Sequence, residues 1–165
     1  MAIWNDKRIY EWINSGGVEN ADQICINPAS LDLRWSGRYR IAGLNDWNEQ
    51  EDCDSLLLVH GAFYLLDTLE YVKMPDNCVG KLFLKSSAGR MGIEHLHAGY
   101  VDPGFEGTLT LEIELRVRWP ITIERGARLV QLTIEEMVDR PAIPYAKVGR
   151  YSGQRVPTRS KGLPK

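Results

Sequence analysis

The fold of this chain is decided by one stretch of its sequence, TLTLEIELRVRW at residues 108–119. Six apolar side chains alternate with six polar ones along this stretch. That alternation is typical of a β-strand with one face on a core and the other face polar. We therefore predict a strand over residues 108–119, with Leu111 on the core face and Glu112 on the polar face.

Shorter β-rich runs lie on both sides of this strand. They occur at residues 31–35, 56–59, 62–66, 70–73, 79–84, 121–124 and 128–137, with turn residues between them. Only the start of the chain predicts a helix, capped by Asn5 or Asp6, extending to about Ser15 and ended by Gly16-Gly17. Many short strands with Gly and Pro turns indicate an all-β sandwich or jelly-roll-like barrel.

Length and composition limit the class of protein. The chain has 165 residues, 44% of them hydrophobic, which predicts a single globular domain over residues 1–165. Its 20 Lys and Arg against 22 Asp and Glu argue against a nucleic-acid binder or a basic membrane-surface protein, but leave small anionic ligands open. Without a leader segment or an apolar run of roughly 20 residues, we expect a cytoplasmic protein that does not span a membrane.

Familiar catalytic and metal-binding motifs are missing from the sequence. It has no P-loop, no G-x-S-x-G elbow, and neither H-x-E nor P-C-x-x-C, so we expect no zinc site of the nucleobase-deaminase kind. Its cysteines, Cys25, Cys53 and Cys78, are far apart and are expected to be reduced core or surface residues. His95 and His97 have the spacing of two metal ligands, but without a third ligand nearby we interpret them as loop or interface histidines.

Two segments have the composition of a binding or catalytic site. Residues 85–90, KSSAGR, combine two cations and two hydroxyls, which suits a phosphate-bearing ligand but also a solvated turn. Residues 99–107, GYVDPGFEG, are expected to form a tight turn into the long strand that carries Glu112. A carboxylate on a rigid strand suits a general base if it faces a pocket, and otherwise forms part of a solvated face.

Five segments, in this order, resemble the dCTP deaminase branch of the dUTPase superfamily. They are INPASLDLR at 26–34, TLE at 68–70, KSSAGR at 85–90, AGYVDPGF at 98–105 with TLE at 110–112, and PYAKVGRYSGQR at 144–155. The resemblance implies a dUTPase-like distorted jelly-roll barrel at 24–143 and a short N-terminal helix within 1–17. Residues 144–165, which alone read as a mobile tail, would then be a flexible lid that orders over bound nucleotide.

The same resemblance implies a role for each matching residue. Glu112 would activate a water at C4 of cytosine and pass the proton to the leaving ammonia. Ser86 and the backbone at Ala98 would hold that water, while Arg90 would stabilise the developing charge. Asp102 would bind the deoxyribose hydroxyl, and Phe105 would lie near the sugar. The other implied substrate-binding residues are Lys85, Ser87, Ala88, Gly89, Thr110, Leu111, Gln131, Tyr145, Arg150 and Gln154.

The resemblance also implies a homotrimer with sites between subunits, and Mg²⁺ bound through the triphosphate instead of a protein metal site. Our leading hypothesis is deamination of dCTP to dUTP and ammonia. One alternative is a dUMP-forming dCTP deaminase or a dUTP diphosphatase, in which Asp102 would activate the water; Lys85 and Gln131 favour it slightly. The short loop at residues 92–98, with His97 where the family usually has Thr, leaves a modified pyrimidine substrate open. Another alternative is a non-catalytic nucleotide-binding regulator. The retained Glu112, Ser86 and Arg90 argue against it, because a protein that only binds nucleotide needs the phosphate-binding cations more than the carboxylate.

Overall fold

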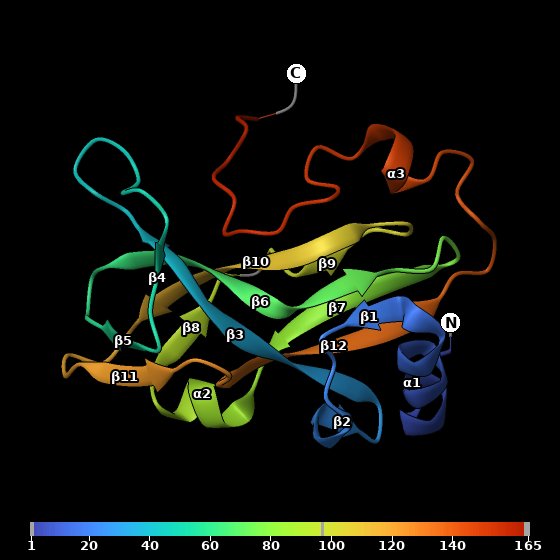
Figure 1. Ribbon diagram of the computed structural model, residues 1–165, viewed down its shortest axis with the longest axis horizontal. Coiled ribbons are helices and arrows are strands. Elements are labelled where there is room, and N and C mark those ends of the chain that lie inside the picture. Colours follow the sequence, from blue (N-terminus) through green and yellow to red (C-terminus); the bar gives the residue numbers. More distant parts are fainter. Residues whose placement is uncertain (1, 97, 164–165) are drawn as a thin grey trace.

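The computed structural model describes residues 2–96 and 98–163 and consists mainly of antiparallel strands that curl into a half-barrel (Figure 1). Within these residues one ten-stranded sheet has the central order β8-β10-β6-β3-β12-β7-β9. A two-stranded sheet, β11-β5, lies beside it. The strands are β1 (Val18–Glu19), β2 (Ile26–Asn27), β3 (Ser30–Ile41), β4 (Glu51–Asp52), β5 (Ser55–Leu58), β6 (Phe63–Lys73), β7 (Cys78–Leu84), β8 (Ile93–His95), β9 (Tyr100–Val101), β10 (Glu106–Leu115), β11 (Ile121–Glu124) and β12 (Arg128–Glu136).

The N-terminal helix forms where the sequence predicts it. Helix α1 spans Asp6–Trp12, and the side chain of Asn5 caps it by accepting a hydrogen bond from the backbone N–H of Arg8 at 3.1 Å. A π-type turn over Ile13–Gly17 continues it until Gly16, whose φ of 86° ends the helical path. Ile9 and Trp12 are buried, so the helix is attached to the domain through its apolar stripe.

The predicted strands form, with corrections to their bounds. Strand β3 extends from Ser30 to Ile41, well beyond the predicted 31–35. Strand β10 stops at Leu115, and Trp119, which we expected on the core face, is 65% exposed. The chain turns there because Pro120, which cannot donate to a ladder, precedes β11. Residues 62–66 and 70–73, which we predicted as separate strands, belong to the single strand β6.

The interruption in the apolar pattern of β6 arises from two buried carboxylates. Asp67 is fully buried and accepts a hydrogen bond from Arg38 Nη2 at 2.7 Å. Glu70 is also fully buried and accepts from Arg34 Nε at 2.7 Å. Burial raises the pKa of both carboxyl groups, and the neighbouring guanidinium groups oppose that shift. The strand continues through these two carboxylates because each of them is paired with an arginine.

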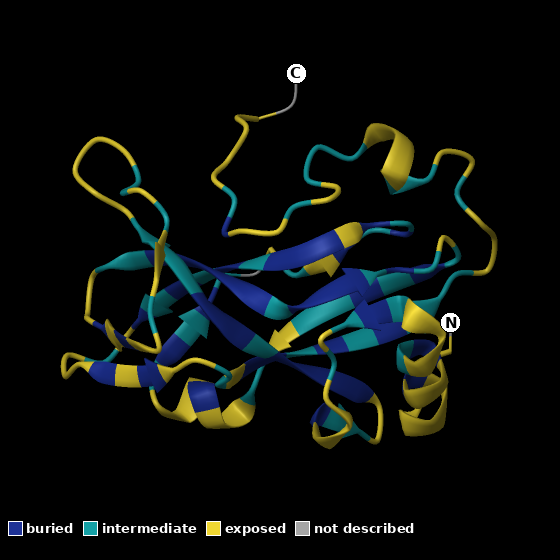
Figure 2. Cartoon of the chain, in the orientation of Figure 1, coloured by how far each residue is buried: buried dark blue, intermediate teal, exposed yellow. Residues whose placement is uncertain are grey.

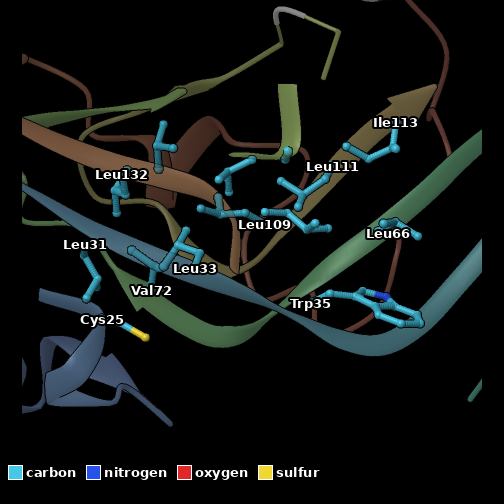
Figure 3. Packing of buried hydrophobic residues seen from close by; sticks show 14 of the residues in the cluster. Cys25, Leu31, Leu33, Trp35, Leu66, Val72, Leu109, Leu111, Ile113 and Leu132 are labelled. Carbon is cyan, nitrogen blue, oxygen red and sulfur yellow. The ribbon is translucent and has the colours of Figure 1, made fainter. Parts of the chain in front are cut away.

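The hydrophobic core lies between the curled halves of the sheet. Figure 2 shows the central strands as the most buried part of the chain, and Figure 3 shows their side chains packed together. Residues from distant strands, including Leu33, Leu66, Leu111 and Leu132, are completely buried in one cluster. Leu111 thus faces the core as the alternation predicts.

Two short helices were not predicted from the sequence. Helix α2 spans Ser86–Arg90 and α3 spans Tyr145–Val148. The cysteines are free thiols, as expected, and Cys25 and Cys78 are buried. Among the described residues no helix is long and apolar enough to cross a membrane.

Candidate active site

A cavity of about 410 Å³ opens beside β10, between the sheet and the C-terminal segment. Its walls carry the side chains of both candidate catalytic carboxylates, together with many aromatic rings and no Lys or Arg among the described residues. The lining residues are Trp47, Phe63, Leu65, Leu82, Ala98, Tyr100, Val101, Asp102, Phe105, Leu109, Thr110, Glu112, Tyr145, Tyr151, Gln154, Thr158 and Ser160.

Glu112 lies in the middle of β10, where neighbouring strands on both sides fix its backbone. It is opposite Leu65 of β6, and its carbonyl accepts a hydrogen bond from Leu96 N–H at 3.0 Å, just beyond β8. The Glu112 side chain is 27% exposed and contributes to the cavity wall together with Ala98. The predicted general base therefore faces a pocket and not open solvent.

The turn before β10 brings Asp102 and Phe105 to the same cavity. Phe105 N–H donates to the Asp102 carbonyl at 3.1 Å, and Gly104 adopts a φ of 77°, which a residue with a Cβ rarely adopts. Burial raises the pKa of the Asp102 carboxyl group. A carboxylate with a raised pKa accepts a proton more readily, which suits a general base.

The C-terminal segment lies along β10 (Figure 1), and five of its residues line the cavity. Gln154 holds this segment against β10. Its side-chain Nε2 donates to the Thr108 carbonyl at 2.7 Å, and its backbone carbonyl accepts from Thr108 N–H at 2.9 Å. Thr158 N–H also donates to Thr110 Oγ1 at 3.2 Å, and the Tyr145 ring packs on Phe105 with centroids 5.7 Å apart. The C-terminal segment thus contributes to the cavity wall, and its role as a lid that orders over nucleotide stays a prediction.

Residues 85–90 lie away from this cavity. Helix α2 is on the other side of the strands from the C-terminal segment (Figure 1), and the side chains of Ser86, Ser87 and Arg90 are exposed there. Lys85 Nζ instead contacts both carboxylate oxygens of Asp32 at 2.6 Å. One chain thus brings together only part of the predicted site.

The remaining predicted binding residues are also separated from the cavity. Leu111 is in the core, so only its backbone is available to a ligand. Gln131 lies on β12 opposite Asp32, with its Oε1 accepting from Ser30 Oγ at 3.4 Å. Arg150 donates to the carbonyl of Gly162 at 2.5 Å, within the C-terminal segment.

Comparison with known proteins identifies the family of this chain. A family model described as dCTP deaminase-like matches residues 3–137. The chain belongs to the dCTP deaminase-like family. A relative from Corynebacterium glutamicum named dCTP deaminase, dUMP-forming, is 35% identical over 96% of this chain and 95% of its own length. A protein of the same name from Methanobrevibacter smithii is 34% identical over 92% of this chain and 89% of its own.

Solved structures show the fold of the dCTP deaminase-like family. The 2'-deoxycytidine 5'-triphosphate deaminase from Agrobacterium tumefaciens superposes with a TM-score of 0.70 at 25% identity, covering 81% of this chain and 48% of that one. This chain therefore spans about half the length of that protein. A dUTPase from Staphylococcus bacteriophage 80alpha superposes with a TM-score of 0.52 at 16% identity, over 76% of this chain and 92% of that one.

Several site residues lie outside the segments that resemble the family. Trp47 packs against Phe63 with ring centroids 5.2 Å apart, and both line the cavity. Trp47 lies in a loop of Gly, Asn and Asp residues, so no periodicity in the sequence relates it to β6. Thr158 and Ser160, just beyond the segment 144–155, also line the cavity, and only their proximity to that segment could have indicated them.

The structure tests the interpretation of only one of the two histidines. His95, interpreted as a loop or interface residue, is buried in β8 and only 6% exposed, while His97 lies outside the described residues. Across residues 2–96 and 98–163 no three His, Cys, Asp or Glu side chains are grouped so that they could hold a metal ion. His95 is related to the candidate site through its contact with the side chain of Glu112.

Proposed function

We propose that this chain is a hydrolytic dCTP deaminase that converts dCTP through dUTP to dUMP. The observation that carries the proposal is near-full-length similarity to relatives named dCTP deaminase, dUMP-forming. Two carboxylates in one cavity, Glu112 and Asp102, agree with two hydrolytic steps. From the sequence alone we expected release of dUTP, whereas the names of these relatives favour the dUMP-forming alternative.

The first step replaces the 4-amino group of cytosine with oxygen. Water adds to C4 while Glu112 accepts its proton, and the same carboxyl group then protonates the departing amine, so that dCTP and water give dUTP and ammonia. The backbone at Ala98 lies in the same cavity and would hold the water. Charge that develops on the ring requires donors fixed in advance, the role proposed for Ser86 and Arg90.

The second step cleaves between the α and β phosphates. Asp102 would accept the proton of a second water, so that dUTP and water give dUMP and pyrophosphate. Burial raises the pKa of Asp102, which makes its carboxylate a stronger proton acceptor. Mg²⁺ would be bound through the triphosphate and would neutralise part of its charge.

A triphosphate requires cations, and the lining of the cavity contains none among the described residues. Helix α2 carries exposed hydroxyl groups and Arg90 on a different side of the same chain. We therefore propose that the active site forms between subunits of a homotrimer, with α2 of one subunit completing the cavity of the next. This arrangement supplies Ser86, Ser87 and Arg90 to a cavity whose charged side chains, among the described residues, are all carboxylates.

The test of this function is ammonia release from dCTP in the presence of Mg²⁺ by wild-type protein and two variants. Glu112→Gln should abolish ammonia release while dCTP still binds, because the amide cannot accept the proton. Glu114→Gln is a matched control, since Glu114 is two positions further along β10 and does not line the cavity. Nucleotide binding by wild type without ammonia or pyrophosphate release would instead indicate a regulator.

A further inference from the structure

Two buried polar atoms face each other at the candidate base, and neither has a hydrogen-bond partner among residues 2–96 and 98–163. They are Oε2 of Glu112 and Nε2 of His95, which lie 3.6 Å apart. The His95 side chain is 3% exposed, so water does not replace the missing partner. Because buried polar atoms in proteins almost always have hydrogen-bond partners, this pair requires an explanation.

The backbone holds the two residues on adjacent strands. His95 of β8 is paired with Ile113 of β10, the residue directly after Glu112. The hydrogen bond from Leu96 N–H to the Glu112 carbonyl fixes the same register. Strand pairing therefore fixes the backbones of the two residues near each other, and the 3.6 Å between Nε2 and Oε2 shows that their side chains meet at the end of β8.

The chemistry of the two groups is complementary. A neutral imidazole carries one N–H, and with the proton on Nε2 the ring is a donor directed at Glu112. The ionised carboxylate only accepts. The gap of 3.6 Å exceeds a normal N–H···O distance by a few tenths of an ångström, so a small side-chain movement completes the bond.

We propose that His95 is a positioning residue for Glu112. Its Nε2–H holds Oε2, which leaves the other carboxylate oxygen to accept the proton of the water in the cavity. A carboxylate fixed through one oxygen loses rotational freedom about its terminal bond, and this fixes the direction in which it accepts a proton. This inference rests on the proposed function, because it assigns Glu112 as the base.

Variants at His95 separate positioning from folding. His95→Phe removes the donor at similar volume and should lower kcat for ammonia release by roughly 10- to 100-fold, with KM changed less than about twofold. His95→Gln keeps an N–H donor at a similar reach and should restore most of the loss. His60→Gln is the control, because His60 Nδ1 already contacts the Leu115 carbonyl at 3.1 Å and the residue does not line the cavity.

A second measurement does not depend on turnover. Nitrogen-15 NMR of the neutral His95 ring, assigned with the His95→Gln variant, should show the proton on Nε2. A proton on Nδ1, or wild-type kcat in a folded His95→Phe protein, would overturn the proposal. If wild-type protein releases no ammonia from dCTP, the proposed function fails, and the NMR result still decides whether His95 donates to Glu112.

Discussion

Lys85 Nζ lies 2.6 Å from both carboxylate oxygens of Asp32, a residue with no exposed surface. The family resemblance implies that Lys85 binds phosphate, yet in this chain its charge already compensates a buried acid. Asn27 Nδ2 at 2.8 Å and Arg128 Nη1 at 3.4 Å are the other donors to that carboxylate. Lys85 thus links β3 to the start of α2, and its role in stability is distinct from any role in binding.

Replacing Lys85 should destabilise the fold. Lys85→Met leaves Asp32 buried with weaker partners, which should lower the free energy of unfolding by about 2–4 kcal/mol. Lys81→Met is the matched control, because Lys81 pairs with the partly exposed Glu135 and should cost about 1 kcal/mol or less. Urea unfolding of both variants measures the difference. Equal losses of unfolding free energy in the two variants would show that the buried Lys85–Asp32 pair contributes no more to stability than the Lys81–Glu135 pair.

Mixed trimers should recover activity from two inactive variants. If α2 completes the cavity of a neighbouring subunit, Arg90→Ala and Glu112→Gln damage opposite halves of one shared site. Refolding them together at equal ratio should restore ammonia release at about one quarter of the sites, whereas each variant alone stays inactive. Mixtures that show only the sum of the separate activities would place both residues in the site of one chain.

The hydrogen bonds of Gln154 should control how well the lid holds substrate. Gln154→Ala removes the bond to the Thr108 carbonyl and should raise KM for dCTP by roughly 3- to 10-fold, which corresponds to about 1 kcal/mol. Arg155→Ala is the control on the same segment, because its guanidinium lies 4.0 Å from the Tyr71 ring and does not line the cavity. Steady-state kinetics distinguish the two variants. An unchanged KM in Gln154→Ala would contradict a lid role.

Pyrophosphate release should be lost at acid pH through protonation of Asp102. Burial raises the pKa of this carboxyl group, and a general base acts only when it is deprotonated, so the rate should fall as the pH decreases through that raised pKa. The midpoint should lie above about 3.9, the ordinary value for aspartate. Stopped assays of pyrophosphate from dUTP measure the profile in wild type and Glu112→Gln. Release by Asp102→Asn at the wild-type rate would exclude Asp102 as this base.

The fold was largely predictable because its strands alternate. Strand β11 has the predicted bounds, and the cap at Asn5 is as expected. Prediction failed where a partner far away in the sequence decides the outcome. Asp67 interrupts the apolar run of β6, but it is buried because Arg38 pairs with it from β3. A local pattern cannot contain that information.

The candidate site was predictable in part for a similar reason. Short motifs identified Glu112, Asp102 and Gln154, all of which line one cavity. The resemblance implied sites between subunits, but the motifs alone did not indicate which of their residues one chain brings together and that residues 85–90 lie elsewhere. His95, which we interpreted as a loop or interface residue, is buried in β8, and its spacing to His97 could not indicate that Glu112 lies beside it.

The most direct test of the central claim is the ratio of ammonia to pyrophosphate released from dCTP with Mg²⁺ by the wild-type protein. Glu112 and Asp102 acting in succession in one site predict equal amounts of the two products, with dUMP as the nucleotide formed. Ammonia without pyrophosphate, with dUTP accumulating, would contradict the dUMP-forming assignment. Pyrophosphate without ammonia would contradict deamination itself.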